Sequence, residues 1–107
     1  MAYDENLAVR MRVALEGSAG LVEKKLFGGQ GFTINGNMAA SVYHDGRLMI
    51  RCAKADHETL LAEPGASPKL SGTKPMAGWV LVESSVVVND NVLLESVVRG
   101  RDYAASL

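Results

Sequence analysis

Cysteine, histidine and aromatic residues are scarce in this sequence, and the scarcity excludes several classes of protein. The single cysteine, Cys52, rules out an intrachain disulfide framework and suits a reducing compartment. The two histidines, His44 and His57, do not form with Cys52 the close ligand pairs that zinc sites normally use. We therefore expect no metal site and no cofactor, and we expect Cys52 to pack as a small hydrophobic residue.

The sequence also lacks a dominant charge and a long apolar run. Eleven Lys and Arg residues face twelve Asp and Glu residues, so the net charge of −1 gives no general attraction to nucleic acid or lipid. No stretch approaches the roughly 20 apolar residues that span a bilayer, and the first residues do not resemble a signal peptide. We expect a cytoplasmic protein that contacts no membrane and binds no nucleic acid directly with high affinity.

What the chain does have is enough hydrophobic sequence for one core, with 48% of its 107 residues hydrophobic. We expect a single domain over residues 1–107. Apolar residues recur at helical spacing over residues 4–16, and again after Asn89 or Asp90, either of which is expected to cap the last helix. Gly100 is expected to weaken that helix by about 1 kcal/mol relative to alanine.

Between these helices the hydrophobic period changes to two, which is typical of strands with one face in the core. Asn35-Gly36 and Asp45-Gly46 each predict a type I′ turn, because both central residues of that turn need positive φ. The glycine-rich residues 28–31 interrupt the first strand and predict a bulge or a tight turn.

The second half of the chain alternates in the same way. Asp56 is expected to cap a short helix. Residues 64–78 are expected to form a long surface loop, with a short strand at residues 69–71 as an open alternative. Residues 79–83 are expected to form a strand. Residues 86–88 either extend that strand or lie in a buried loop. The fold class predicted is α+β, a two-layer arrangement in which an antiparallel sheet of about five to six strands carries helices on one face. The element order is α-β-β-β-α-β-β-α.

No group of residues in the sequence predicts catalysis. The Gly28–Gly31 run is followed by a strand and has no Gly-Lys-Ser/Thr motif, which disfavours a phosphate-binding loop. Ser41, His44 and Asp45 have the residue types of a hydrolase triad, but two of them lie at a turn and no nucleophile elbow is present. We expect that the protein is not an enzyme.

A basic surface is the remaining pattern that points to a class of ligand. Lys24, Lys25, Arg47 and Arg51 share a region if their strands are neighbours, and a basic sheet face with aromatic residues is typical of nucleic-acid binding. Glu23 interrupts this set, and the few aromatic residues are mostly needed in the core. A solvated face is the favoured interpretation.

Several short segments together resemble the N-terminal domain of the TfoX/Sxy family. The matching segments are residues 22–29 (VEKKLFGG, with Leu26 in a place where the family usually has Met), 35–39 (NGNMA), 48–51 (LMIR), 61–66 (LAEPGA) and 74–82 (KPMAGWVLV). The resemblance implies a helix-covered antiparallel sheet. Longer family members promote natural competence, working with the cyclic-AMP receptor protein at competence promoters, and carry a C-terminal domain; this chain is expected to be a stand-alone N-terminal domain. The family offers no catalytic residues to carry over.

From these observations we predict a non-enzymatic protein-interaction module, related to transcriptional regulation of competence, with a protein partner. A homodimer is also expected, because small domains often pair an open sheet and Met49 lies on a sheet face opposite the core. The alternative is a small-molecule-binding or enzymatic domain that uses the Gly28–Gly31 bend and the 64–78 loop. The matched glycines also fit a purely structural role. The candidate interaction surface comprises Phe27, Gly28, Gly29, Met49 and Met76.

Overall fold

The computed structural model of the protein describes residues 5–26, 29–43 and 45–107. Within these residues the strands are β1 (Leu21–Leu26), β2 (Gly29–Ile34), β3 (Asn37–Val42), β4 (Leu48–Arg51), β5 (Ala66–Ser71) and β6 (Lys74–Val82). The helices are α1 (Glu5–Ala14), the 3-10 turn η1 (Lys54–Asp56), α2 (His57–Leu61), α3 (Ser84–Val87) and α4 (Asp90–Ala105). The strands form one antiparallel sheet in the order β1-β2-β3-β4-β6-β5. The predicted fold class and element order are confirmed.

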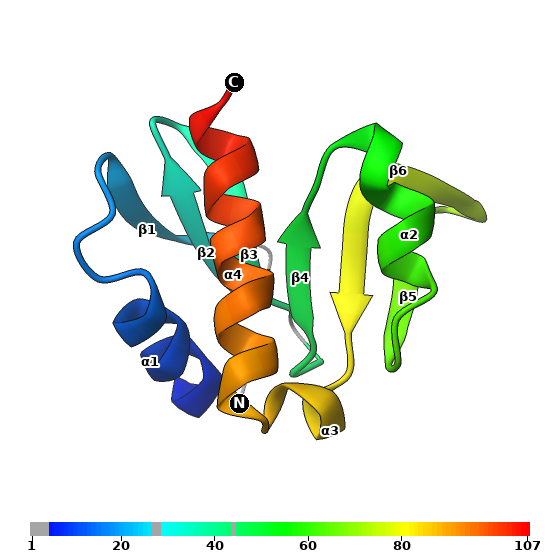
Figure 1. The fold of residues 1–107 in the computed structure, drawn as a ribbon, viewed down its shortest axis with the longest axis horizontal. Coiled ribbons are helices and arrows are strands. Elements are labelled where there is room, and N and C mark those ends of the chain that lie inside the picture. Colours follow the sequence, from blue (N-terminus) through cyan, green and yellow to red (C-terminus); the bar gives the residue numbers. More distant parts are fainter. Residues whose placement is uncertain (1–4, 27–28, 44) are drawn as a thin grey trace.

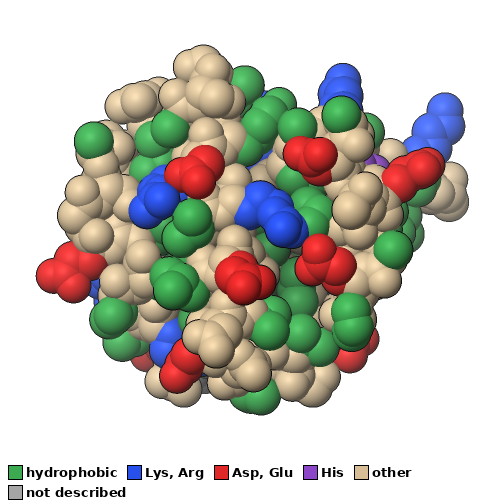
Figure 2. Space-filling view, in the orientation of Figure 1, with side chains coloured by type: hydrophobic (Ala, Val, Ile, Leu, Met, Phe, Trp, Pro, Cys, Tyr) green, Lys and Arg blue, Asp and Glu red, His purple; other side chains and the backbone are tan. Residues whose placement is uncertain are grey.

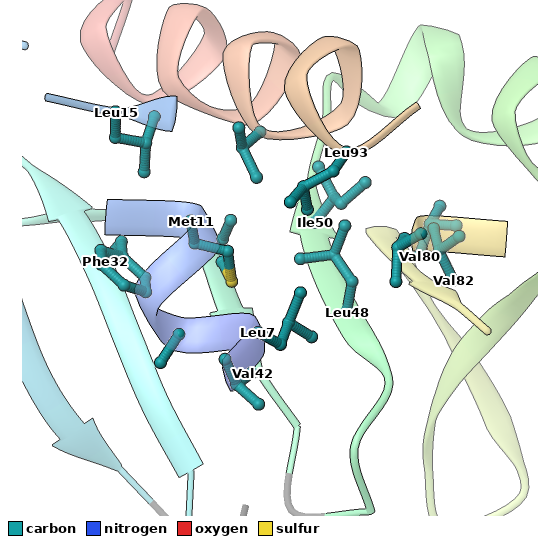
Figure 3. Close-up of a cluster of buried hydrophobic side chains, with 14 of the residues drawn as sticks. Leu7, Met11, Leu15, Phe32, Val42, Leu48, Ile50, Val80, Val82 and Leu93 are labelled. Atoms are coloured by element: carbon teal, nitrogen blue, oxygen red, sulfur yellow. The ribbon is translucent and has the colours of Figure 1, made fainter. Parts of the chain in front are cut away.

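The helices form a single layer over one face of the sheet. Figure 1 shows α4 running across the middle of the sheet, with α1 on one side of it and α2 on the other. The core fills the space between the two layers, and Figure 3 shows its central part. Ten of its buried side chains are labelled there: Leu7, Met11, Leu15, Phe32, Val42, Leu48, Ile50, Val80, Val82 and Leu93. No helix in the described part of the chain has the length and apolar character needed to cross a membrane.

The first four strands form a meander. β1 ends at Leu26 and pairs antiparallel with β2, which begins at Gly29, so the glycine run marks a chain reversal and the interrupted strand is two strands. The next turn is the predicted type I′ turn, with φ of 52° at Asn35 and 85° at Gly36. The same prediction for Asp45-Gly46 is wrong. Gly46 has positive φ, but the Tyr43 N–H donates to the Arg47 carbonyl at 2.8 Å, so the chain does not close as a two-residue turn at Asp45-Gly46.

A register shift between β2 and β3 brings the sheet close to α4. Phe32 pairs with Ala40 and Thr33 pairs with Met38, so Ala39 is an extra residue on β3. Both Ala39 and Ala40 are fully buried, and Ala39 packs with Ile34 and with Ala104 of α4. The two small alanine side chains at the bulge therefore allow the C-terminal half of α4 to pack close to β3.

The prediction of a long loop over residues 64–78 is wrong, but the alternative of a strand at residues 69–71 is confirmed, because these residues belong to β5. Most of this segment is a hairpin, in which β5 and the first half of β6 pair antiparallel around Gly72. Its proline and glycine content predicts a loop, but Pro68 is tolerated because β5 is an edge strand, where a missing N–H leaves no partner unsatisfied. Both alternatives for residues 86–88 are wrong: they neither extend the strand nor lie in a buried loop, since α3 spans Ser84–Val87 and Val88 is exposed.

One of the predicted helix caps is confirmed and another is wrong. Asn89 caps α4, because its side-chain Oδ1 accepts hydrogen bonds from the backbone N–H groups of Asn91 at 2.9 Å and Val92 at 3.2 Å. Asp56 precedes α2 as predicted, but its side chain makes no capping hydrogen bond. The predicted cap is wrong there because α2 continues directly from η1, so its first turn does not start from extended backbone.

Candidate functional site

One face of the sheet carries no helix from the described part of the chain, and strand alternation defines which side chains lie on it. Leu48 and Ile50 of β4 are buried in the core, so Met49 between them points to the other side. Val80 and Val82 place Trp79 and Leu81 of β6 on that side in the same way. We call this side the open face. Its described side chains include Lys24, Ser41, Tyr43, Arg47, Met49, Arg51, Ser67, Lys69, Trp79 and Leu81.

Met49 and Leu81 form the apolar centre of the open face. The sheet register places Ser41, Met49, Leu81 and Ser67 in one row across β3, β4, β6 and β5. Solvated faces of antiparallel sheets normally carry polar residues, so this row departs from the usual pattern. Leu81 is only 3% exposed although no helix covers it, which means that neighbouring side chains shield it.

Long side chains from β5 and from the residues beside β3 and β4 provide that shield. Arg47, which immediately precedes β4, reaches Ser67 of β5 with its Nη1 3.3 Å from the hydroxyl oxygen, and β6 with Leu81 lies between β4 and β5. The Arg47 guanidinium also lies 5.8 Å from the centre of the Tyr43 ring, and the Lys69 ammonium lies 5.7 Å from the same centre. Two cationic groups therefore lie within cation–π distance of the Tyr43 ring, beside the apolar row.

The cations of the open face are held by aromatic rings and one carboxylate. Asp45 lies 2.7 Å from the Arg47 guanidinium, and its hydrogen bond raises the pKa of that group against the opposing effect of burial. The Arg51 guanidinium lies 5.4 Å from the Trp79 ring centre and 5.6 Å from that of Tyr103 on α4. These contacts fix the positions of long side chains that otherwise lose entropy when a partner binds.

The residues predicted from sequence fall into three groups. Phe27 and Gly28 lie outside the described residues. Gly29 begins β2, where it is buried and pairs with Leu26. Met49 lies half-buried on the open face, and Met76 adjoins it, with its sulfur 4.0 Å from the Lys69 ammonium. Met49 and Met76 are thus on one side of the sheet, while Gly29 is two strands away from β4.

Tyr43, Lys69 and Trp79 belong to this surface but are absent from the sequence prediction. Alternation with Val80 and Val82 is a signal that finds Trp79. No local signal finds the contact between Tyr43 and Lys69, because their strands meet only through the long-range pairing of β4 with β6.

The four basic residues considered as a nucleic-acid-binding face do not converge, in agreement with the favoured interpretation of a solvated face. Lys24 pairs with Gly31 and Lys25 pairs with Gln30, so adjacent positions on β1 place the two lysines on opposite sides of the sheet. Glu23, on the helix side, binds Arg12 of α1 through two contacts of 2.7 Å, which lower the pKa of its carboxyl group. This pair joins α1 to the edge strand and adds nothing to the open face.

The chemically reactive groups are buried. Cys52 packs in the core, as predicted, and is 2% exposed; burial, followed by the nearby Asp56 carboxylate, raises the pKa of its thiol. The position of His57 near the start of α2 suggests an exposed side chain, but His57 is only 8% exposed, and its Nε2 lies 3.3 Å from the Trp79 carbonyl oxygen. Ser41 is likewise buried. Among the described residues no three His, Cys, Asp or Glu side chains are placed to hold a metal ion.

Two hollows on the helix side of the molecule are lined entirely by described residues. One, of about 230 Å³, lies between α4, α2 and the β5–β6 hairpin. The other is wider and shallower, at about 580 Å³, and lies between α4 and the chain after β4. Arg99 of α4 lines both. Neither of these two hollows is lined by Gly29 or Gly31.

Comparison with known proteins identifies one relationship. The family model described as TfoX N-terminal domain matches residues 14–103, which is most of the chain. No curated protein and no solved structure matches the sequence or the fold.

Proposed function

The chain belongs to the TfoX N-terminal domain family, and from that premise we propose that it is a non-enzymatic protein-interaction module. The family is of a regulatory type and is not a known family of enzymes. The proposed role is in transcriptional regulation of the kind that the competence regulators of this family perform, in the bacterial cytoplasm. The proposed binding site is the open face.

The observation that carries this proposal is the apolar row at the centre of that face. Met49 and Leu81 sit where an antiparallel sheet normally presents polar residues to water, and Trp79 lies beside them. Methionine adapts its shape to a partner, and tryptophan and arginine are enriched where protein interfaces are strongest. The row is bordered by Arg47 and Lys69, so the proposed partner presents an apolar segment flanked by carboxylates.

A protein partner fits this surface better than a nucleic acid. Non-specific nucleic-acid affinity comes from Lys and Arg residues that meet successive phosphates. Here Arg47 is paired with Asp45, Lys24 lies at the far edge of the sheet and Lys25 points to the other side. We therefore propose that direct, tight binding to duplex DNA is not part of the function.

Replacing Met49 by aspartate tests the open face as the binding site. A carboxylate in the apolar row must be desolvated when a partner covers it, so we expect loss of partner binding, by at least about tenfold, with the fold intact because the position is half-exposed. The partner is first captured by site-specific photo-crosslinking from position 49 in the native host. The affinity of the captured partner for the purified wild type and for the variant is then measured.

The matched control is Leu94→Asp. Leu94 is 47% exposed on α4, on the opposite side of the molecule, so its replacement introduces the same charge away from the open face. Partner binding should survive Leu94→Asp. If Met49→Asp binds the partner as tightly as the wild type, or if crosslinks form only from position 94, the open face is not the site.

The same face is the proposed site of a homodimer. The two edge strands are poorly suited to pairing with another copy, since β1 carries Lys24 and Lys25 and β5 carries Pro68 and Lys69. Self-association is therefore expected through Met49 and its neighbours. Light scattering at high micromolar concentration should give a dimer mass for the wild type and a monomer mass for Met49→Asp. A wild-type monomer under these conditions contradicts the dimer.

A further inference from the structure

The smaller hollow has the features of a ligand site that the proposed function does not use. Its volume is about 230 Å³ and its walls are mainly apolar, with side chains from the sheet at the bottom and from the helices at the sides. Figure 2 shows a hollow beside α4 in which hydrophobic side chains are rimmed by basic and acidic ones. The residues that line it are Ile50, Leu60, Glu63, Pro64, Ala66, Val80, Val82, Val86, Val92, Ser96 and Arg99.

The pocket exists because the helix layer is incomplete over β6. α2 has only five residues and packs on β5 and β6, so it leaves space beside the sixteen-residue α4. On α4, the wall is formed by Val92, Ser96 and Arg99, which recur at the spacing of one helix face. The small Ser96 side chain leaves the entrance open between them.

The rim carries one positive and one negative charge. Arg99 Nη1 lies 3.4 Å from Glu63 Oε2, and the two side chains are 45% and 56% exposed. Exposed ion pairs of this kind contribute little to stability, so the pair separates at low cost. A ligand that offers a carboxylate to Arg99 and an ammonium to Glu63 replaces both lost contacts with charge-assisted hydrogen bonds.

The surroundings of Arg99 argue against a simple anion. On its other side, Arg99 shares the wider hollow with Asp56, Glu95 and Asp102, whose carboxylates repel a bare negative charge. A zwitterion brings no net charge into this region. An apolar cavity of roughly 150 Å³ accepts a benzene-sized molecule, so the pocket has room for a branched aliphatic or aromatic side chain.

From this geometry we propose that the pocket binds a free apolar α-amino acid. The side chain enters between α4 and the β5–β6 hairpin, the α-carboxylate binds Arg99 and the α-ammonium binds Glu63. The site lies on the helix side of the sheet, so it is separate from the open face and does not depend on the proposed protein partner.

Three related probes separate the two charges. L-Leucine carries both, 4-methylpentanoate lacks the ammonium group, and 3-methylbutylamine lacks the carboxylate. Titration of the isotope-labelled chain, followed by amide chemical shifts around Ser96, should show saturable binding of leucine. Each single-charge analogue should bind about tenfold more weakly, the loss expected for one charge-assisted contact.

Variants assign each charge to its residue. Arg99→Gln should reduce the affinity for leucine about tenfold and leave the affinity for 3-methylbutylamine unchanged. Glu63→Gln should also reduce the affinity for leucine about tenfold, but leave the affinity for 4-methylpentanoate unchanged. Arg101→Gln and Glu58→Gln are matched controls, since neither residue lines the pocket, and both should bind leucine normally.

A blocking variant tests the location. Ser96→Leu places a larger side chain in the entrance at a partly exposed helical position, where leucine is a good helix former, and should abolish binding without lowering the melting temperature. The proposal is overturned by absence of leucine binding, by equal binding of leucine and both analogues, or by leucine binding that persists in Ser96→Leu.

Discussion

Alanine in place of Gly100 should destabilise the protein by about 2 kcal/mol and lower its melting temperature by roughly 10 °C. In an isolated helix this change is favourable by about 1 kcal/mol, which is the basis of the sequence expectation that Gly100 weakens α4. The structure reverses that expectation. A Cβ at position 100 would lie 2.2 Å from the Ala39 carbonyl oxygen and 3.2 Å from Ile50 Cγ2, so α4 must move away from the sheet.

Thermal and urea denaturation of Gly100→Ala measure the effect. Glu95→Ala, at an exposed position on the same helix, serves as the control and should change stability by less than about 0.5 kcal/mol. Because the obstacle is the backbone of Ala39, adding Ala39→Gly should not restore stability. A Gly100→Ala variant at least as stable as the wild type would mean that α4 does not approach β3 this closely.

Gly78→Ala should be destabilising for a different reason, by about 2–3 kcal/mol, equivalent to a melting temperature lower by roughly 10–15 °C. Gly78 has a φ of +90°, which a residue with a Cβ adopts only at a cost of about 1–2 kcal/mol. The added Cβ would also lie 2.9 Å from the Cys52 carbonyl oxygen. The Gly78 carbonyl accepts a hydrogen bond from the Cys52 N–H at 2.8 Å. The strain caused by the added Cβ is therefore located at the end of the pairing between β4 and β6.

Gly72→Ala separates the two contributions. Gly72 also has positive φ, at +63°, but a Cβ there would meet no atom within 4 Å. Its replacement should therefore cost only the backbone strain, about 1 kcal/mol. Equilibrium denaturation of both variants gives the difference, which measures the contact with Cys52. Equal losses for the two variants would show that this contact contributes nothing.

Local sequence patterns predict only part of the open face. Strand alternation correctly puts Met49 opposite Leu48 and Ile50, because side chains on a strand point to alternate sides whatever the strand pairs with. The family motif includes Met76, whose sulfur lies 4.0 Å from the Lys69 ammonium beside this surface; its role in binding stays a prediction. The rest of the predicted surface, Phe27 and Gly28, lies outside the described residues, and its role stays a prediction.

The residues that surround Met49 and Met76 are known only from the tertiary structure. Tyr43 and Lys69 are 26 positions apart in the sequence, and they meet only because β6 pairs with β4 on one side and β5 on the other. The pocket beside α4 has the same origin, since it depends on how far a short α2 stands from a long α4. Neither arrangement follows from the propensity of any one segment.

The sequence by itself determined the family, the α+β class, the Asn35-Gly36 turn and the inward faces of the strands. These features depend on residues within a few positions of one another, so spacing is enough to predict them. The tertiary structure alone decided that residues 66–82 pair as a hairpin at the sheet edge and that Gly100 fits against Ala39. Both depend on contacts between distant segments, where the packing of close-lying backbones outweighs local preference.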